Sequence, residues 1–360
     1  MPPGRTKRIH CVDLFAGAGG LSLAALRAGF FVVAAVENNP HACDTYRTNL
    51  VSDSFPVLYQ QDITALSPSE LMRAHFADGD VCDVVLGGPP CQGFSVHRFR
   101  NAGVDDRRNL LLLTYFEFVV ALQPKYFLVE NVPGMLWERH RPFLDAFYSQ
   151  GRQSGYCVYP PVILDARDYG VPQRRKRVFV LGVRRDVTHP AQWPPPATHG
   201  SPRLCAENPK LKPWLVCGPV FSAPVPDGDE NDVHMNHSPA LVEVFRNTPP
   251  NGGSRTASGR VLDCHKNHDG HSDVYGRIDP YQPAPTMTTA CINPSKGRFV
   301  HPTEHYGITV RQAARLQTFP DTFVFKGGIM AAGCQIGNAV PIRLGEQLLK
   351  VLYDLAWSHP

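Results

Sequence analysis

Residues 10–20 read His-Cys-Val-Asp-Leu-Phe-Ala-Gly-Ala-Gly-Gly, and a helical pattern follows them over residues 21–28. The beginning of this stretch is mostly apolar, as is typical of a short buried strand. Gly17, Gly19 and Gly20 let a ligand approach the backbone closely, beside the free N–H groups at the start of a helix. The stretch therefore predicts a strand, a ligand-binding turn and a helix.

The same alternation of strand and helix continues to about residue 185. Runs of β-branched and aliphatic residues predict further strands at 31–36, 82–86, 126–129 and 178–183. Helical patterns lie between them at 41–49, 69–76, 109–122 and 142–150. Because such alternation is typical of parallel sheets covered by helices, we expect an α/β fold with a mostly parallel, doubly wound sheet.

The pattern changes beyond residue 188. Prolines and glycines interrupt every long period up to about residue 299, so few helices or long strands are expected there. A helical pattern returns at 309–317, with Thr309 as its N-cap, and a last helix is expected over 342–356. These patterns predict a first part of the α/β domain at 8–188, a smaller irregular domain at 189–300, and a segment at 301–358 that completes the α/β domain.

Composition excludes several classes of protein. The chain has 360 residues, is 43% hydrophobic and carries a formal net charge of +4, so any nucleic-acid surface must be a local basic patch. Its 10 cysteines form no C-x-x-C pair, which favours reduced intracellular thiols over a disulfide framework. We see no signal peptide, and the longest apolar run, 30–36, is too short to cross a bilayer. We expect a cytoplasmic enzyme in a prokaryote or a nuclear enzyme in a eukaryote.

Acidic residues at the ends of the next strands indicate a nucleotide-like cofactor. Glu37 ends the second predicted strand, where a carboxylate can accept from ribose hydroxyls. Asp62, followed by Ile63, comes after a further strand expected between the second strand and Asp62, where it can accept from an adenine amino group. Phe15, beside the glycines, can pack on an adenine ring or belong to the core. A nicotinamide cofactor would also suit these residues, so they do not decide between cofactors.

Cys91 is the candidate nucleophile, in the run Gly87-Gly88-Pro89-Pro90-Cys91-Gln92. The run follows a predicted strand, and ligands of open α/β sheets bind at that edge. Two prolines stiffen the approach to the thiol, which suits covalent catalysis. A lone cysteine is more often an inert buried residue, so the interpretation depends on the neighbouring groups.

Two further elements supply such neighbours. Glu130 ends the next apolar strand and can protonate a ring nitrogen if burial raises its pKa. In Gln173-Arg174-Arg175-Lys176-Arg177, alternation along a strand puts Arg175 and Arg177 on one face. Two arginines directed into one pocket can bind a carbonyl and a phosphate. The alternative is that Glu130 is a solvated acid at a strand end and that residues 174–177 form an ordinary solvated basic run.

These segments, in this order, resemble the DNA (cytosine-5-)-methyltransferase family over nearly the whole chain. Two later segments add to the resemblance: Arg311 to Gln317 followed by Phe319-Pro320, and Gln335-Ile336-Gly337-Asn338-Ala339-Val340-Pro341. The resemblance implies a Rossmann-like fold with S-adenosyl-L-methionine as cofactor. It implies that the cofactor is bound by Asp13, Phe15, Gly17, Gly19, Gly20, Leu21, Glu37, Asp62, Ile63, Pro90, Leu110, Asn338 and Val340.

The resemblance also implies the chemistry. Cys91 would add to carbon 6 of a flipped-out cytosine, Glu130 would hold or protonate N3, and Arg175 would hold the base carbonyl. Arg177 would fix Arg175, Glu130 or the nearby loop. Carbon 5 then accepts the methyl group, and Cys91 leaves. Base flipping is required because the reacting atoms are inaccessible inside a duplex.

The irregular insert occupies the position of the family's target-recognition domain. Its basic residues, Arg255, Arg260, Lys266, Arg277, Lys296 and Arg298, can supply phosphate contacts, while Gln92, Ser95 and Arg107 of the catalytic loop are expected to touch DNA. Cys264, His265, His268 and His271 lack a second cysteine pair, so we expect no metal. The expected partner is double-stranded DNA and the expected state a monomer. The target sequence and the biological role, restriction–modification or epigenetic marking, are not visible in the sequence.

Three alternatives remain open. A relative acting on transfer RNA would share the catalytic elements, although this chain lacks the Cys-Phe-Thr signature of that branch and has a longer insert. An inactive DNA-binding homologue would have a damaged catalytic element, whereas Cys91, Glu130, Arg175 and Arg177 are all present. A nicotinamide oxidoreductase has no use for Pro-Pro-Cys.

Overall fold

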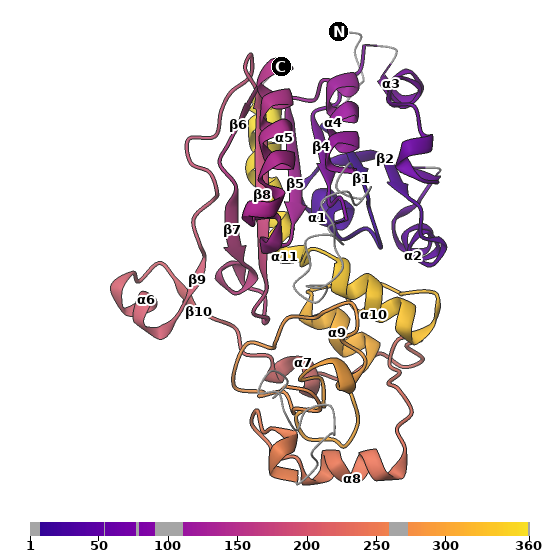
Figure 1. Cartoon of the computed structure of the whole chain (residues 1–360), viewed down its shortest axis with the longest axis vertical. Coiled ribbons are helices and arrows are strands. Elements are labelled where there is room, and N and C mark those ends of the chain that lie inside the picture. Colours follow the sequence, from indigo (N-terminus) through magenta and orange to yellow (C-terminus); the bar gives the residue numbers. More distant parts are fainter. Residues whose placement is uncertain (1–7, 54, 77–78, 91–110, 259–272, 359–360) are drawn as a thin grey trace. The chain divides into compact units, whose positions relative to one another are not determined.

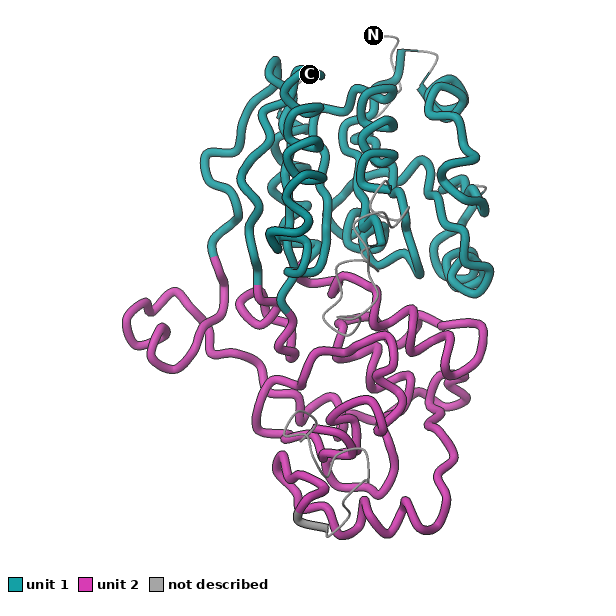
Figure 2. Tube along the Cα trace, in the orientation of Figure 1, with its two compact units in different colours: residues 1–164, 176–196, 345–360 teal, residues 165–175, 197–344 magenta. Residues whose placement is uncertain are grey.

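The structure is a computed structural model that describes residues 8–53, 55–76, 79–90, 111–258 and 273–358. It divides into two compact units, coloured separately in Figure 2. The first unit consists of residues 1–164, 176–196 and 345–360, and the second of residues 165–175 and 197–344. No helix among the described residues is both long and apolar enough to span a membrane.

The first unit is built on an eight-stranded sheet (Figure 1). Along the sheet the strands are β3 (Val57–Gln60), β2 (Phe31–Glu37), β1 (His10–Leu14), β4 (Val84–Gly87), β5 (Tyr126–Asn131), β8 (Lys176–Arg184) and β6 (Tyr156–Val158), with β7 (Val162–Asp165) paired to β8. The strands from β3 to β5 pair in parallel, whereas β8 is antiparallel to β5 and β6. This confirms the expected mostly parallel α/β sheet. The strand order reverses at β1, so ligands are expected beyond the carboxyl ends of β1 and its neighbours.

Helices cover the sheet, as the alternating pattern predicts. They are α1 (Gly20–Ala28), α2 (Pro40–Leu50), α3 (Pro68–Phe76), α4 (Leu111–Leu122), α5 (Arg141–Gln153) and α11 (Ile342–Ser358). Figure 1 shows α4 and α5 in front of the sheet and α11 behind it. Tyr353 of α11 packs edge-on against Phe30, which follows α1, with ring centroids 5.3 Å apart. The last helix therefore lies beside the first, as the resemblance implies.

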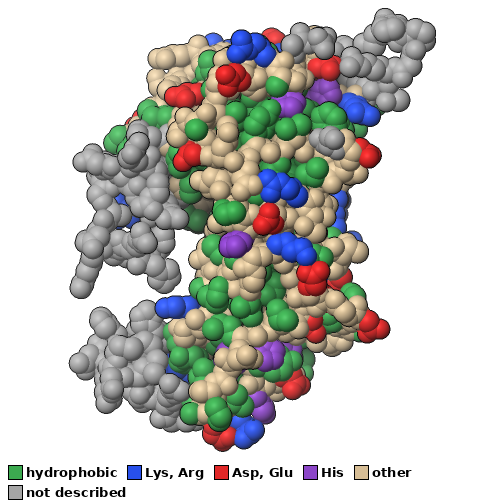
Figure 3. Space-filling view, turned by 90° about the vertical axis from the view of Figure 1, so that its right-hand side faces the viewer, with side chains coloured by type: hydrophobic (Ala, Val, Ile, Leu, Met, Phe, Trp, Pro, Cys, Tyr) green, Lys and Arg blue, Asp and Glu red, His purple; other side chains and the backbone are tan. Residues whose placement is uncertain are grey.

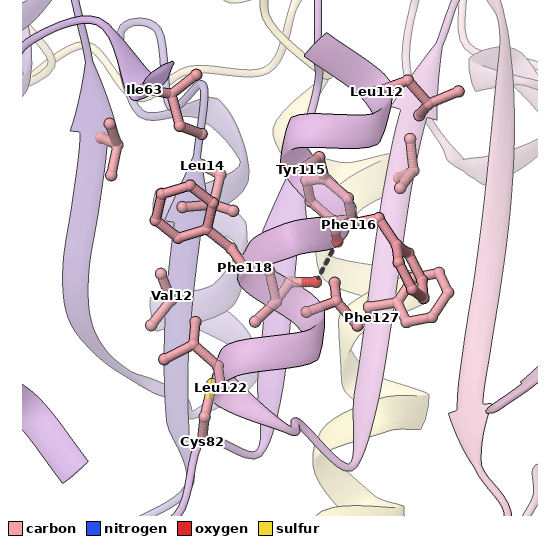
Figure 4. Packing of buried hydrophobic residues seen from close by; sticks show 14 of the residues in the cluster. Val12, Leu14, Ile63, Cys82, Leu112, Tyr115, Phe116, Phe118, Leu122 and Phe127 are labelled. Atoms are coloured by element: carbon pink, nitrogen blue, oxygen red, sulfur yellow. Dashed lines mark hydrogen bonds between the residues drawn. The ribbon is translucent and has the colours of Figure 1, made fainter. Parts of the chain in front are cut away.

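Aromatic residues of α4 fill the core between that helix and the sheet (Figure 4). Tyr115 and Phe116 are fully buried, and the Tyr115 hydroxyl donates to the Val85 carbonyl over 2.9 Å. A Cβ on Gly87 would lie 2.6 Å from the Tyr115 ring, so the ring fits only against a glycine. This packing fixes the carboxyl end of β4, from which the segment that leads to Cys91 begins.

The second unit contains little regular structure, as expected from its prolines and glycines. Its helices are α6 (Pro202–Glu207), α7 (Gly218–Ser222), α8 (Pro239–Asn247), α9 (Val310–Leu316), α10 (Gly328–Asn338) and the start of α11, and β9 (His199–Gly200) pairs with β10 (Lys212–Pro213). Thr309 caps α9 in a capping box with Gln312, which confirms the expected N-cap. The bounds of this compact unit differ from those of the predicted domains, because residues 301–344 group with the insert. The predicted division into 8–188, 189–300 and 301–358 stays a prediction about function.

Buried arginines hold part of the insert together, although the sequence offered them as possible phosphate contacts. Arg277 is 3% exposed and donates to the carbonyls of Thr248, His301, Glu304 and Phe245. Arg255 is also buried, and Arg298 pairs with Asp273 at 2.7 Å. On the face shown in Figure 3, described Lys and Arg side chains alternate with acidic ones, as on an ordinary solvated surface.

Candidate active site

The turn after β1 has the backbone that the glycines predict. Gly17 and Gly19 have φ angles of 57° and 91°, and Phe15, which is half-buried, also has a positive φ of 60°. A Cβ on Gly19 would lie 2.2 Å from Leu50 of α2, so only glycine allows this close approach. Gly20 and Leu21 begin α1 and are buried. The turn therefore brings backbone N–H groups to the end of β1.

Glu37 organises the same turn from the end of β2. One of its carboxylate oxygens accepts from the Gly17 N–H at 2.8 Å, and the other accepts from the N–H groups of Asn38 and Asn39 at 2.9 and 2.7 Å. The side chain is half-buried. Oε2, which accepts only the Gly17 N–H, has further acceptor capacity, so this position suits a group with a hydroxyl donor.

Asp13 lies beneath the turn in a buried chain of hydrogen bonds. The Tyr46 hydroxyl donates to Ser22 Oγ at 2.8 Å, and the Ser22 hydroxyl donates to Asp13 Oδ2 at 2.6 Å. Asp13 Oδ1 has no hydrogen-bond partner within the described part of the chain. Burial, with a smaller contribution from the nearby Glu37 charge, raises the pKa of Asp13 to about 7. The site thus holds a carboxyl group that a cationic ligand would stabilise in its charged form.

Asp62 and Ile63 lie at the end of β3. Asp62 caps a short 3-10 helix by accepting from the N–H and the hydroxyl of Thr64, at 2.9 and 2.7 Å. Ile63 is buried at 4% exposure. A cavity of about 370 Å³ opens beside them, lined by residues 63–68 and by Thr114 and Glu117 of α4.

Glu130 and Arg177 form an ion pair at the junction of β5 and β8. Arg177 Nε lies 2.9 Å from Glu130 Oε1, and both side chains are nearly buried, at 12% and 10% exposure. Glu130 and Arg177 lie close in the β5–β8 ladder, because Glu130 is registered with Phe179 on the antiparallel strand. The sequence predicted each residue, and the structure brings them together.

The loop that leads to Cys91 is held against the same strand end. Asn131 donates from Nδ2 to the Pro89 carbonyl at 3.2 Å, and its Oδ1 accepts from the Val132 N–H. A Cβ on Gly88 would lie 3.2 Å from Glu130 Oε2. The loop and the carboxylate therefore sit in close contact. Cys91, Gln92, Ser95, Arg107 and Leu110 lie outside the described residues, and exposed Pro90 is the last residue before them.

Arg175 differs from the expectation. Exposure alternates as predicted, with Arg174 and Lys176 exposed and Arg175 and Arg177 turned inward. Arg175, however, is fully buried, and its two terminal nitrogens donate to the carbonyls of Met287, Gly337 and Ala339. Its terminal nitrogens are thus used within the second unit, and the assignment of the base carbonyl to either arginine stays a prediction.

The two late cofactor candidates lie in the second unit. Asn338 is exposed at the end of α10, and Val340 is buried at 4% exposure. A Cβ on the preceding Gly337 would lie 2.2 Å from the Thr288 backbone, so this close approach requires glycine.

Sequence reasoning missed Ser22 and Tyr46 as buried polar residues, and it missed the burial of Gln317. Ser22 and Tyr46 occupy helical positions where a polar side chain normally faces solvent. Gln317 ends a helical pattern, where an amide is unremarkable. Only their burial, at 0% exposure in each case, distinguishes them, and no local pattern predicts it.

Comparison with known proteins shows the family of this chain. The family model described as C-5 cytosine-specific DNA methylase matches residues 9–354. The Type II methyltransferase M1.HphI of Haemophilus parahaemolyticus is 34% identical over 354 residues, 96% of this chain and 86% of that protein. M.XorII of Xanthomonas oryzae is 33% identical over 375 residues, 95% of this chain and 84% of that protein.

Solved structures share the architecture. One, named for a DNA modification methyltransferase encoded within an E. coli prophage, has a TM-score of 0.69 and 28% identity, covering 96% of this chain and 99% of its own. The S. pombe Dnmt2 methyltransferase, with a TM-score of 0.57 and 18% identity over 96% of this chain and 99% of its own, shows the fold alone. The family match spans nearly the whole chain, which therefore belongs to the C-5 cytosine-specific DNA methylase family and is a DNA cytosine methyltransferase.

Proposed function

We propose that this enzyme methylates carbon 5 of cytosine in a specific double-stranded DNA sequence through a transient covalent bond from Cys91 to a flipped-out base. The observation that carries the proposal is the Glu130–Arg177 ion pair beside the Gly88–Pro89 turn. A carboxyl group and a guanidinium group next to the start of the nucleophile loop suit a ring nitrogen and a carbonyl. An inactive homologue would have no need of this intact arrangement.

S-Adenosyl-L-methionine fits the residues around the end of β1. The buried Asp13 oxygen without a partner, the glycine turn and the spare acceptor capacity of Glu37 suit a cationic ligand with ribose hydroxyls. Asp62 and Ile63 would hold the adenine, with Phe15 against the ring. Pro90, Leu110, Asn338 and Val340 are the further contacts that the resemblance implies. When bound, the cofactor supplies the methyl group.

The chain's own residues carry the remaining steps. The Cys91 thiolate adds to carbon 6, which breaks aromaticity and makes carbon 5 nucleophilic. Glu130 holds N3 and the proton on it, so that negative charge does not build up on the ring. Arg177 holds Glu130 and the base carbonyl. After methylation, water removes the proton from carbon 5 and the carbon–sulfur bond to Cys91 breaks, which restores the ring.

One experiment tests the proposal. The purified protein and Cys91→Ala are incubated with tritiated S-adenosyl-L-methionine and mixed-sequence DNA, and the product is mapped by bisulfite sequencing. We expect label at carbon 5 of cytosine within one recurring sequence, and none with Cys91→Ala. Label in RNA alone, or label that persists in Cys91→Ala, would contradict the proposal. DNA containing 5-fluorocytosine should trap the wild-type protein covalently, because the fluorine cannot leave as a proton does.

The curated relatives named above are Type II methyltransferases. We therefore propose the modification half of a restriction–modification pair as the biological role. We also propose that the enzyme acts as a monomer in the cytoplasm of a bacterium. Sedimentation of the protein alone and with a cognate duplex would test the monomer, since a dimer would double the mass bound per site.

A further inference from the structure

A buried polar cluster joins four separate stretches of the second unit. We call it the glutamine–arginine cluster, and it consists of Gln173, Arg175 and Gln317. All three side chains are fully buried at 0% exposure. Gln173 and Arg175 belong to the basic segment 173–177, and Gln317 follows helix α9. Their side chains bind the insert at Met287 and the segment 336–339. The catalytic chemistry proposed above uses none of their side chains.

The side-chain amide of Gln317 makes hydrogen bonds to two parts of the chain, the segment 336–339 and Gln173. Its Nε2 donates to the carbonyls of Ile336 and Ala339 at 2.7 and 3.1 Å, and its Oε1 accepts from Gln173 Nε2 at 2.9 Å. The backbone carbonyl of Gln317 also accepts from the Ile342 N–H. The amide therefore holds the chain on both sides of Asn338 and Val340.

Met287, in the insert, is held from both sides by the other two members. Gln173 Oε1 accepts from the Met287 N–H at 2.9 Å, and Arg175 Nη1 donates to the Met287 carbonyl at 2.7 Å. Arg175 Nη2 donates to the carbonyls of Gly337 and Ala339 at 2.7 and 2.9 Å. Ala339 and Met287 are therefore connected through shared side-chain donors.

The network leaves little freedom for one segment to move alone. A displacement of the Ala339 carbonyl would break bonds from both Arg175 and Gln317, and a buried polar group left unpaired is costly. Thr288 also lies against Gly337, where a Cβ would come within 2.2 Å of its backbone. Segments 286–288 and 336–340 should therefore shift together.

We propose that Gln317, as a positioning residue, couples the cofactor segment at 338–340 to the recognition segment at 286–288, so that cofactor and DNA bind cooperatively. The inference rests on the proposed function, because it takes Asn338 and Val340 as cofactor contacts and the insert as the DNA-reading part. Coupling between two sites is reciprocal, so each ligand should raise the affinity for the other by the same factor.

The test measures that factor directly. Calorimetry gives the Kd of S-adenosylhomocysteine for the free protein and for the protein saturated with the duplex found by the bisulfite map. We expect the duplex to tighten binding by about 5- to 150-fold in the wild type, as is typical of coupled sites. In Gln317→Met, which fills similar space without hydrogen bonds, the ratio should fall clearly below the wild-type value, while the bonds from Arg175 retain part of the coupling.

Asn231→Leu is the matched control. Asn231 is a buried amide of the same unit that donates to the Phe325 carbonyl and accepts from the Phe325 N–H, and these bonds lie outside the cluster. Its loss should lower the melting temperature and leave the ratio at the wild-type value. A wild-type ratio in Gln317→Met, or an equal loss of coupling in Asn231→Leu, would overturn the proposal.

Two further measurements cover a variant that fails to fold. Gln317→Glu keeps the acceptor for Gln173 but places an oxygen against the carbonyls of Ile336 and Ala339, and it should also reduce the ratio. In the wild type, S-adenosylhomocysteine alone should slow amide hydrogen exchange at Met287, and unchanged exchange there would overturn the proposal. If the wild type neither binds the cofactor nor methylates DNA, the proposed function itself has failed.

Discussion

Arg175 and Arg177 are two positions apart, yet their guanidinium groups have different surroundings. Arg177 is paired with Glu130, whereas Arg175 donates to three backbone carbonyls. The alternating pattern predicted that both turn inward. The pattern could not identify their hydrogen-bond partners, because those of Arg175 lie more than 100 positions away in the sequence.

Arg177→Lys should lower the rate of methyl transfer and leave the fold intact. Lysine keeps the positive charge but cannot reproduce the planar, two-donor geometry of arginine. We expect kcat to fall by about 100-fold, at the lower end of the range for a lost electrostatic contact in an active site, because lysine keeps the charge. Single-turnover kinetics measure this. Arg175→Met is the comparison, and it should instead lower the melting temperature of the protein. A normal rate in Arg177→Lys would contradict the assigned role.

Asp13→Asn should stabilise the protein without ligand and weaken cofactor binding. The folded state holds a proton on Asp13 up to about pH 7, whereas the ordinary pKa is 3.8, so folded stability from this group is present at low pH and is lost as pH rises between these values. The amide cannot ionise, so the variant should gain about 1–2 kcal/mol at pH 8.

Urea unfolding at pH 8 and at pH 5 measures the Asp13→Asn effect, which should be smaller at pH 5. The Kd of the cofactor should rise because a cation loses its carboxylate. Ser22→Ala provides the control, since it removes the hydroxyl that donates to Asp13 and keeps the Asp13 carboxyl group. Equal stabilisation by Asp13→Asn at both pH values would contradict the titration of Asp13.

At the scale of elements, buried strands could be predicted, and short, partly exposed ones could not. β1, β2, β5 and β8 lie within a few residues of the expected runs. β6 and β7 were missed, since each has only three or four residues, some of them exposed, and two prolines separate them. In the insert, α8 was also missed, although Ser238 caps it and Pro239 begins it. Its burial depends on contacts with distant segments.

Gly88→Ala tests how closely the end of β4 approaches β5. The added methyl group would lie 3.2 Å from Glu130 Oε2, so the carboxylate or the loop must give way. Because small displacements of catalytic groups are costly, we expect methyl transfer to fall by about 10- to 100-fold. A glycine such as Gly155 makes a poor control position, because its positive φ of 88° would strain any other residue. Ser149→Ala, on α5, should leave the rate unchanged.

At the scale of the molecule, the order of elements predicted the α/β sheet but not the division into units. Residues 301–344 form one compact unit with the insert, while the predicted segment 301–358 that completes the α/β domain stays a prediction. The buried pair of Arg311 with Asp229 and the contact of Asn231 with Phe325 join the two stretches. Both contacts connect residues more than 80 positions apart, and the local hydrophobic pattern of a sequence cannot predict contacts over such a separation.

Acid should destabilise both units, through a different histidine in each. Burial lowers the pKa of His140 in the first unit and of His301 in the second to about 4. His301 Nδ1 accepts from the N–H groups of Thr303 and Glu304, which an imidazolium cannot do. The unfolded chain binds these protons near pH 6.5, so stability is retained above that pH and is lost as pH falls toward 4.

Each histidine should contribute a loss of about 2 kcal/mol between pH 7 and pH 5. Urea titrations at the two pH values measure the total, and His301→Gln separates the two units, because the glutamine amide oxygen can replace the Nδ1 acceptor without titrating. In this variant the urea midpoint of the second unit should depend less on pH than in the wild type, whereas the first unit should keep its dependence. The same acid-induced loss in His301→Gln as in the wild type would show that His301 does not carry the effect in the second unit.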